Sequence, residues 1–243
     1  MSRILRLVLA VFLISASVAF AQADEIQDAT IAAPEAHSVV FENEHVRVIS
    51  AIASAGHKSP LHSHPPLVVI SMGTARAKIT NADGTGGIIN VRPGTVFWGD
   101  SAAHEWELLA GEIDIIAVEV KAALAESEAN GGDDSEGAVE SAEGVQDSTI
   151  ADPGAHSVVM ENEHVRVISA IASAGYKSPM HSHPPLMVVQ MDTGRLNLKN
   201  ADGSEALLNV RPGSVLWLDG AEHEWEIMGG KLNAIAVEIK AAK

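Results

Sequence analysis

The chain has 243 residues, a formal net charge of -16 at pH 7 and no cysteine. The lack of cysteine excludes disulfide bonds and thiolate metal ligands, which leaves histidine and oxygen groups as the ligands for any bound metal. A chain this acidic repels polyanions, so we expect no nucleic-acid partner. Its field attracts cations instead, including divalent metal ions.

The N-terminal segment has the pattern of a secretory signal peptide. Two arginines precede an apolar run from Leu7 to about Phe20, and the small residues of "AFAQA" follow it. The run is shorter than the roughly 20 residues that a membrane span needs. We therefore expect residues 1–23 to be a signal peptide, cleaved after Ala21 or Ala23. The mature protein is then expected to be secreted into the periplasm, with no membrane attachment.

The remainder of the chain is a tandem duplication. The segment "QDATIAAPEAHSVVFENEHVRVISAIASAG" at Gln27 matches "QDSTIADPGAHSVVMENEHVRVISAIASAG" at Gln146, and about two-thirds of the aligned positions are identical as far as the C-terminus. Between the copies lies an acidic segment rich in Gly, Ser and Ala, which is typical of a solvated linker. The sequence thus predicts a first domain over residues 24–123, a linker over 124–145 and a second domain over 146–243.

Each copy has the pattern of an all-β domain. Apolar and polar residues alternate in "HVRVISAIA" from His45, the pair Asp83-Gly84 is a strong hairpin signal, and "RPGT" from Arg92 has Pro and Gly where a type II turn needs them. Short strands separated by turn residues, with no helical period, predict two small β-barrels or sandwiches. Val and Ile on the sheet faces suggest that the two domains pack together or that chains form a homodimer.

Two histidines one residue apart lie in "GHKSPLHSHPPL" at residues 56–67, and the second copy repeats them. His62 and His64 point to the same face of an extended segment, because side chains alternate along a strand. His104, which follows the Arg-Pro-Gly turn, is the natural third ligand. The corresponding residues of the second copy are His181, His183 and His223. Three neutral imidazoles suit Fe, Mn, Ni, Zn or Cu, whereas a barrel without metal could use the same histidines only to satisfy turns.

These motifs resemble those of the cupin superfamily. "GHKSPLHSH" is similar to the first cupin motif, and "RPGTVFWGDSAAH" at residues 92–104 is similar to the second, in which a turn leads to a histidine. The resemblance implies a tandem bicupin of two double-stranded β-helix barrels, with at most one metal ion in each, held by the two triads. The sequence departs from the family where a Glu ligand usually follows the His pair. Val68 and Val69, or Met187 and Val188, occupy those positions.

Four further residues, two in each copy, are candidates for the pockets around the metals. Trp106 shares the strand face of His104, so Trp106 and its counterpart Trp225 are candidate pocket walls. Lys58 and Lys177 come shortly before the His pairs and are candidates to contact an anionic substrate.

Two functions remain open from the sequence. The resemblance implies a periplasmic bicupin that binds a divalent metal. Its enzymatic form would be similar to the three-histidine mononuclear iron dioxygenases and would act on a small organic molecule. An isomerase or lyase is compatible with the same ligands. The missing Glu and the lack of a clear general base favour instead a non-catalytic protein that binds a small ligand or a metal.

Overall fold

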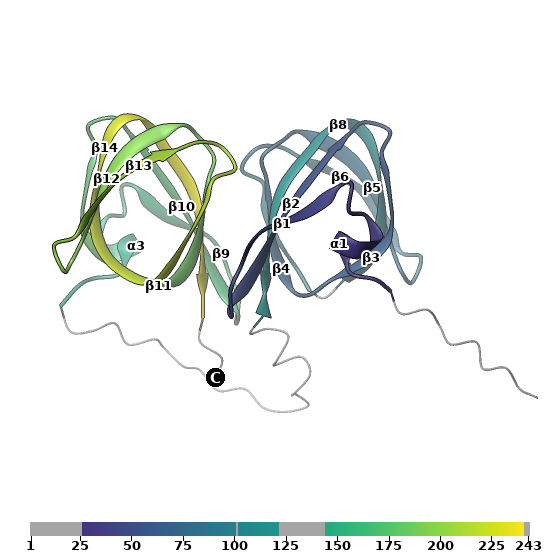
Figure 1. Cartoon of the computed structure of the whole chain (residues 1–243), viewed down its shortest axis with the longest axis horizontal. Coiled ribbons are helices and arrows are strands. Elements are labelled where there is room, and N and C mark those ends of the chain that lie inside the picture. The colour runs from purple at the N-terminus through teal and green to yellow at the C-terminus, as the bar shows by residue number, and fades with distance from the viewer. Residues whose placement is uncertain (1–25, 101, 122–143, 241–243) are drawn as a thin grey trace, which may run out of the picture.

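The computed structural model describes residues 26–100, 102–121 and 144–240. The predicted signal peptide and nearly all of the predicted linker therefore lie outside the described residues. The described ranges form two β-barrels that lie side by side (Figure 1), so the all-β, two-barrel prediction is confirmed. Within these ranges, no helix has the length and apolar character needed to cross a membrane.

The first barrel is an eight-stranded sheet with one short helix. Its elements are α1 (Ala29–Ala32), β1 (His37–Glu42), β2 (Val46–Ser54), β3 (Lys58–His64), β4 (Leu67–Ser71), β5 (Ala75–Asn81), β6 (Gly86–Val91), β7 (Val96–Gly99) and β8 (Ala102–Val120). The strand order is β1-β2-β8-β4-β7, and β8 also pairs with β3 and β5.

The second barrel repeats this plan in six longer strands. Its elements are α3 (Ser148–Ala151), β9 (His156–Glu161), β10 (Val165–Ser173), β11 (Lys177–Gln190), β12 (Gly194–Asn200), β13 (Glu205–Val210) and β14 (Val215–Ile239). The strand order is β13-β12-β14-β10-β9, and β11 pairs with β14.

Strand β8 holds the first barrel together, because β2, β3, β4 and β5 all pair with it. It bends at Gly111, which has a φ of 80°. A Cβ at this position would lie 2.1 Å from the carbonyl oxygen of Thr74, so only glycine fits the bend. The bend lets one strand contribute His104 to the barrel interior before it and Glu119 after it.

The predicted turns are present. Strands β5 and β6 form an antiparallel hairpin around Asp83 and Gly84, with Thr80 opposite Gly86. At the second turn the amide of Thr95 donates to the carbonyl of Arg92 at 2.9 Å, which closes the Arg-Pro-Gly turn before β7.

The alternation in β2 is confirmed, but both faces of the strand are partly buried. Val46 and Val48 belong to an apolar cluster that joins the two barrels, whereas Ile49, Ala51 and Ala53 pack inside the first barrel. The second barrel contributes the matching residues to the joint cluster: Val165, Val167, Met187, Val189, Ile235, Val237 and Ile239. Each fully buried aliphatic side chain contributes about 1.5–3 kcal/mol to stability.

The contact between the barrels is reciprocal. Trp98 of the first barrel stacks on His164 of the second at a ring-centroid distance of 5.5 Å, and Trp217 of the second stacks on His45 of the first at 5.4 Å. Because corresponding residues exchange roles, the two barrels are related like the subunits of a two-fold dimer.

Candidate metal centre

The three histidines of barrel 1 that are predicted to bind one metal ion lie close together. His62 and His64 are on β3, with relative exposures of 0% and 8%, and His62 pairs in register with His104 on β8. The ring centroid of His104 is 4.7 Å from that of His62 and 5.5 Å from that of His64. Strand alternation and cross-strand pairing therefore bring the three rings together, as expected.

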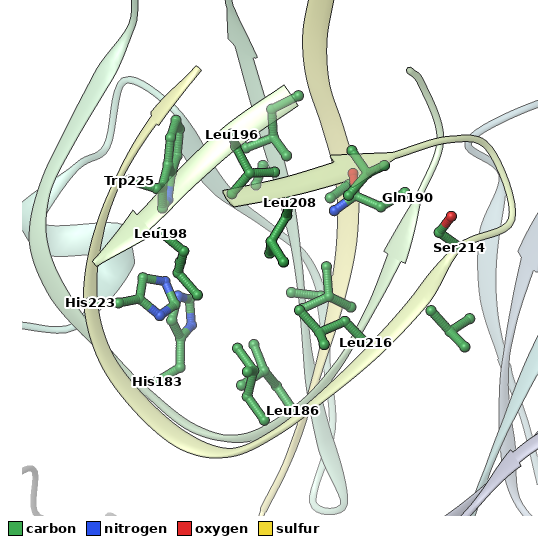
Figure 2. A pocket seen from close by; sticks show the side chains of 18 of the residues that line it. His183, Leu186, Gln190, Leu196, Leu198, Leu208, Ser214, Leu216, His223 and Trp225 are labelled. Atoms are coloured by element: carbon green, nitrogen blue, oxygen red, sulfur yellow. The ribbon is translucent and has the colours of Figure 1, made fainter. Parts of the chain in front are cut away.

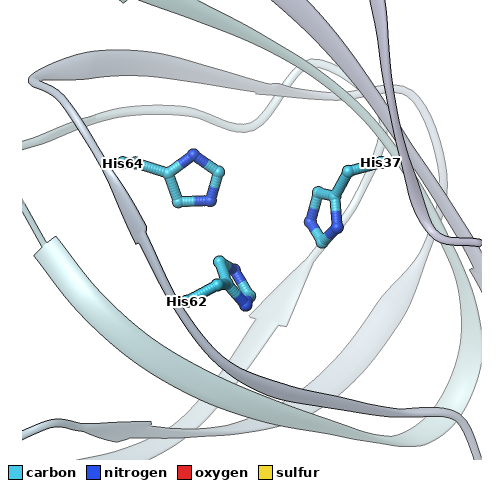
Figure 3. A group of neighbouring side chains, drawn as sticks. All are labelled: His37, His62 and His64. Atoms are coloured by element: carbon cyan, nitrogen blue, oxygen red, sulfur yellow. The ribbon is translucent and has the colours of Figure 1, made fainter. Parts of the chain in front are cut away.

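A fourth histidine, His37, belongs to the same cluster. Its ring lies 4.9 Å from that of His62 and 5.9 Å from that of His64. His37, His62 and His64 each offer one ligand nitrogen, and these nitrogens lie within 4.8 Å of one another (Figure 3). His37 begins β1, far from the motifs, and no local spacing in the sequence marks it.

The hydrogen bonds of these rings orient their lone pairs. The Nδ1 atom of His62 is 2.7 Å from the carbonyl oxygen of Pro60, and that of His37 is 3.1 Å from the carbonyl oxygen of Ala33. A carbonyl oxygen can only accept, so Nδ1 carries the proton in both rings and Nε2 carries a lone pair. The buried Nε2 of His62 has no hydrogen-bond partner among the described residues.

A buried carboxylate orients the remaining ring of this group. His64 donates through Nδ1 to Glu119 at 3.0 Å, and the other carboxylate oxygen of Glu119 accepts from Arg47 at 2.5 Å. Glu119 is fully buried on β8, and Arg47 also pairs with Asp28. Such carboxylate partners fix the tautomer of a metal-binding histidine and raise its basicity. Glu119 thus supports the ring of His64 from behind and does not take the place of the Glu ligand of the cupin motif.

Burial keeps His37, His62 and His104 neutral and therefore able to bind a cation. Burial, together with the neighbouring histidines, lowers the pKa of His62 from 6.5 to about 4 and that of His104 to about 3. Burial also lowers the pKa of His37. At pH 7 these rings are neutral imidazoles, the form in which histidine binds metals.

Barrel 2 repeats the cluster. The ring of His181 lies 4.6 Å from that of His223 and 4.8 Å from that of His156, and the ligand nitrogens of His156, His181 and His183 lie within 4.8 Å of one another. His181 donates to the carbonyl of Pro179 at 2.7 Å, and its buried Nε2 has no partner in the described part of the chain. Burial and the neighbouring rings lower the pKa of His181 to about 4 and that of His223 to about 2.

No family model matches the sequence, and no curated protein matches it. Solved structures do resemble the protein. Oxalate decarboxylase from Bacillus subtilis aligns with a TM-score of 0.56 and 15% identity, over 83% of this chain and 71% of that one. A structure from work on the Mn(II) centres of that same enzyme aligns with a TM-score of 0.53 and 15% identity, over 85% and 73%.

The protein has the bicupin fold. A cupin 2 conserved barrel domain protein from Leptotrichia buccalis also aligns, with a TM-score of 0.49 and 12% identity, over 84% of this chain and 88% of that one. The oxalate decarboxylase alignments, with TM-scores of 0.56 and 0.53, confirm at the level of the fold the resemblance predicted from the two histidine motifs.

The second cupin barrel contains a cavity of about 240 Å³ beside its histidines (Figure 2). His156, His183, His223 and Trp225 line it, as do many leucine and valine side chains. Trp225 is thus a wall of this cavity. Its counterpart Trp106 is buried beside His37, with a ring-centroid distance of 6.2 Å.

Lys58 and Lys177 lie on the outer surface of the cupin barrels, outside the pocket where the sequence placed them. Their side chains are 70% and 71% exposed, and they pair with Glu107 and Glu226 at 3.1 Å and 3.0 Å. The cause is an irregularity in β3 between Ser59 and His62, which breaks the alternation and turns Ser59 inward in place of Lys58.

The residues at the position of the missing Glu face two different regions. Val68 and Met187 are fully buried in the joint core between the barrels, whereas Val188 lines the cavity. An aliphatic wall therefore stands where the cupin motif would offer a carboxylate.

The second barrel has a polar group that the first lacks. Asp152 accepts hydrogen bonds from Tyr176 at 2.6 Å and from Ser178 at 2.5 Å, and its carboxylate lies 3.6 Å from Nδ1 of His156. Burial alone would raise the pKa of Asp152, but the hydrogen bonds from Ser178 and Tyr176 outweigh it and lower the pKa. A negative charge thus lies behind His156.

Proposed function

We propose that the protein is a metal-binding bicupin that holds one divalent ion in each barrel and uses it on a small organic molecule. The observation that carries the proposal is the buried Nε2 atom of His62, and equally that of His181, which has no hydrogen-bond partner within the described ranges. A buried lone pair without a donor costs stability unless something binds it. A cation among several such lone pairs satisfies them together.

The donor set fits a divalent transition metal. His37, His62 and His64 would hold the ion in barrel 1, with His104 next to them. Their counterparts in barrel 2 are His156, His181, His183 and His223. An all-imidazole set suits Fe, Mn, Ni, Zn or Cu. The negative charges of Glu119 and Glu238 lie behind the rings of His64 and His183 rather than on the ion.

We propose an oxidoreductase of the dioxygenase type as the enzymatic form of this function. Bound iron would supply the Lewis acidity and the dioxygen chemistry that the side chains of the chain lack. Glu119 and Glu238 hold the rings of His64 and His183 in a fixed orientation. In barrel 2 the apolar cavity wall, including Trp225, excludes water from the space beside the histidines.

A specific observation favours a second candidate, binding without turnover. Among the described residues that line the cavity of barrel 2 there is no Asp, Glu, Lys or Arg. Only the histidines themselves could move a proton there, and metal coordination would occupy their lone pairs.

We also propose that the protein is exported to the periplasm. The basic, apolar and small-residue pattern of residues 1–23 supports this. Mass spectrometry of protein purified from its native host tests it: a mature N-terminus after Ala21 or Ala23 is expected, and an intact N-terminus in the cytoplasmic fraction would contradict it.

Metal content separates the metal-binding proposal from a barrel with no ion. We expect up to two ions per chain by elemental analysis, and one ion per chain in each of the double variants H62A/H64A and H181A/H183A. The matched control is His57→Tyr, since Tyr already stands at the corresponding position 176 and His57 is outside the ligand group. Wild-type protein that takes up none of Fe, Mn, Ni, Zn or Cu would refute the proposal.

Oxygen uptake separates the two candidate functions. Protein loaded anaerobically with Fe(II) would be mixed with phenols, diketones and thiols in air-saturated buffer. Substrate-dependent oxygen consumption that H181A/H183A or H62A/H64A abolishes supports the dioxygenase. Stoichiometric retention of a compound without oxygen consumption supports the binding protein.

A further inference from the structure

The cavity of barrel 2 has a composition that restricts its ligand. Its volume is about 240 Å³, and most of its lining is aliphatic, with Leu186, Leu196, Leu198, Leu208, Leu216, Leu218 and Leu232 among the lining residues. An apolar cavity of about 150 Å³ is enough to hold benzene. The cavity of barrel 2 therefore has room for a fused bicyclic ring system, which would fill the leucine-lined space.

One end of this cavity carries an unsatisfied polar group. Gln190 ends β11, is 5% exposed and lines the cavity, and its buried Oε1 has no hydrogen-bond partner in the described residues. Figure 2 shows Gln190 and Ser214 on the side of the cavity away from His183 and His223. Leaving a buried acceptor unpaired costs about 1–3 kcal/mol. The cost is recovered when a ligand donates a hydrogen bond to Gln190.

Barrel 1 differs at the corresponding position. Ser71 stands there, and its hydroxyl donates to the carbonyl of Gly73 at 2.9 Å, so it is already paired. Smaller changes accompany it, since Ile115 of barrel 1 corresponds to Ala234, which lines the cavity of barrel 2. The unpaired acceptor therefore belongs to barrel 2.

We propose that barrel 2 selects a small, largely apolar ring compound that carries an uncharged hydrogen-bond donor, an N–H or O–H group, which binds Oε1 of Gln190 at the end of the cavity opposite the histidines. Gln190 is thus a specificity-determining residue of this barrel. The proposal rests on the proposed function in that it names the class of small molecule for one of its two sites. It makes no use of the metal.

The test uses the isosteric pair indole and benzofuran, which differ in that indole has an N–H donor and benzofuran an ether oxygen. Isothermal titration calorimetry on metal-free, full-length protein should show that indole binds about tenfold more tightly than benzofuran. Only indole can donate a hydrogen bond to Oε1 of Gln190. In Gln190→Met, of similar size, the preference should fall to about twofold or less. Gln190→Ser, the barrel 1 residue, serves as the second variant if the methionine variant does not fold.

Two matched variants locate the binding. Ala234→Ile places the barrel 1 residue in the cavity wall. Because the larger side chain fills part of the cavity, the affinity for both compounds should fall at least about tenfold. Ser71→Ala alters the corresponding position of barrel 1 and should leave both affinities unchanged. Equal binding of the two compounds by wild type, a preference retained in Gln190→Met, or no saturable binding at all would overturn the proposal. Metal uptake without indole binding would refute only this inference, and indole binding without metal uptake would refute only the proposed function.

Discussion

The two barrels share the hydrogen bonds behind their histidines and differ in what surrounds them. In barrel 1 the chain of contacts runs from His64 through Glu119 to Arg47, with distances of 3.0 Å and 2.5 Å. In barrel 2 the same chain has distances of 2.7 Å and 2.5 Å and contains His183, Glu238 and Arg166. The device that orients the ligand rings is therefore the same in both.

The differences lie next to this device. Asp152, with its hydrogen bonds from Tyr176 and Ser178, corresponds to Ala33, which has no side-chain acceptor to offer. The acceptor Gln190 corresponds to Ser71. Two copies of one barrel have thus kept the same histidine cluster while the groups behind and beside it have diverged, so equal metal binding and unequal ligand binding are expected.

The largest expected effect tests whether the shared device is equally important in both barrels. Replacing Glu119 or Glu238 by Leu removes a buried carboxylate that pairs with both a histidine and an arginine, and the partly buried arginine keeps only Asp28 or Asp147. Loss of one partner of a buried pair costs about 3–5 kcal/mol, and we expect this loss of unfolding free energy from either variant in denaturant titrations. A cost below about 1 kcal/mol, or a cost in one barrel only, would show that the two carboxylates are not equally important.

The second prediction concerns acid stability of the metal-free protein. The pKa of His62 and that of His181 are each lowered by burial from 6.5 to about 4. Unfolded chains take up these protons near pH 6.5 and the folded chain does so only near pH 4, so stability is full above pH 6.5 and is lost as the pH falls. Each ring contributes a slope of up to about 1.4 kcal/mol per pH unit in this window.

Urea titrations at several pH values check this slope. His62→Gln and His181→Gln should each make the profile between pH 6.5 and pH 4 shallower, and by similar amounts. An unchanged slope in both variants would mean that the rings are protonated in the folded state.

The third prediction concerns metal affinity. Glu119→Gln keeps an acceptor for His64 but removes the negative charge that raises the basicity of the ring. Loss of such a partner costs about 10–100-fold in metal affinity. The measurement is a competition titration with a chelating dye in the H181A/H183A background, where only barrel 1 binds. Glu238→Gln in the H62A/H64A background is the reciprocal experiment, and unequal losses would show that the two sites are not equivalent.

The local sequence pattern was enough to predict the barrels, the turns and the proximity of His62, His64 and His104. Alternation within β3 and one cross-strand pair determine these positions, and both leave a trace in the sequence. Nothing in "GHKSPLHSH" marks the irregularity between Ser59 and His62, which turns Ser59 inward and leaves Lys58 on the surface.

His37 and Glu119 could not be placed from spacing. His37 reaches the cluster because the first segment folds back over the barrel, where Asp28 pairs with Arg47. Glu119 did leave a signal: a lone carboxylate within the apolar strand segment "IIAVEV" must be buried by alternation and needs a cationic or N–H partner. Which partner it finds depends on tertiary pairing of β8 with β2 and β3, which the sequence does not state.

The smallest expected effect isolates the polar group peculiar to barrel 2. Tyr176→Phe removes the hydrogen bond to Asp152 and leaves the ring in place beside Trp225, at a centroid distance of 5.7 Å. A loss of about 1 kcal/mol in unfolding free energy is expected. The affinity of barrel 2 for metal should change little, since Asp152 retains its bond from Ser178.

Transplanting the pair into barrel 1 decides whether the group is self-contained. His57→Tyr alone should gain nothing from the hydroxyl, because Ala33 offers no side-chain acceptor, and Ala33→Asp alone buries a carboxylate without the tyrosine donor. Together they should be more stable than the sum of the single changes by about 1 kcal/mol in a double-mutant cycle. Since the barrels share their backbone plan, a coupling energy near zero would mean that the Tyr176–Asp152 bond depends on further differences between the copies, such as Gly154 in place of Glu35.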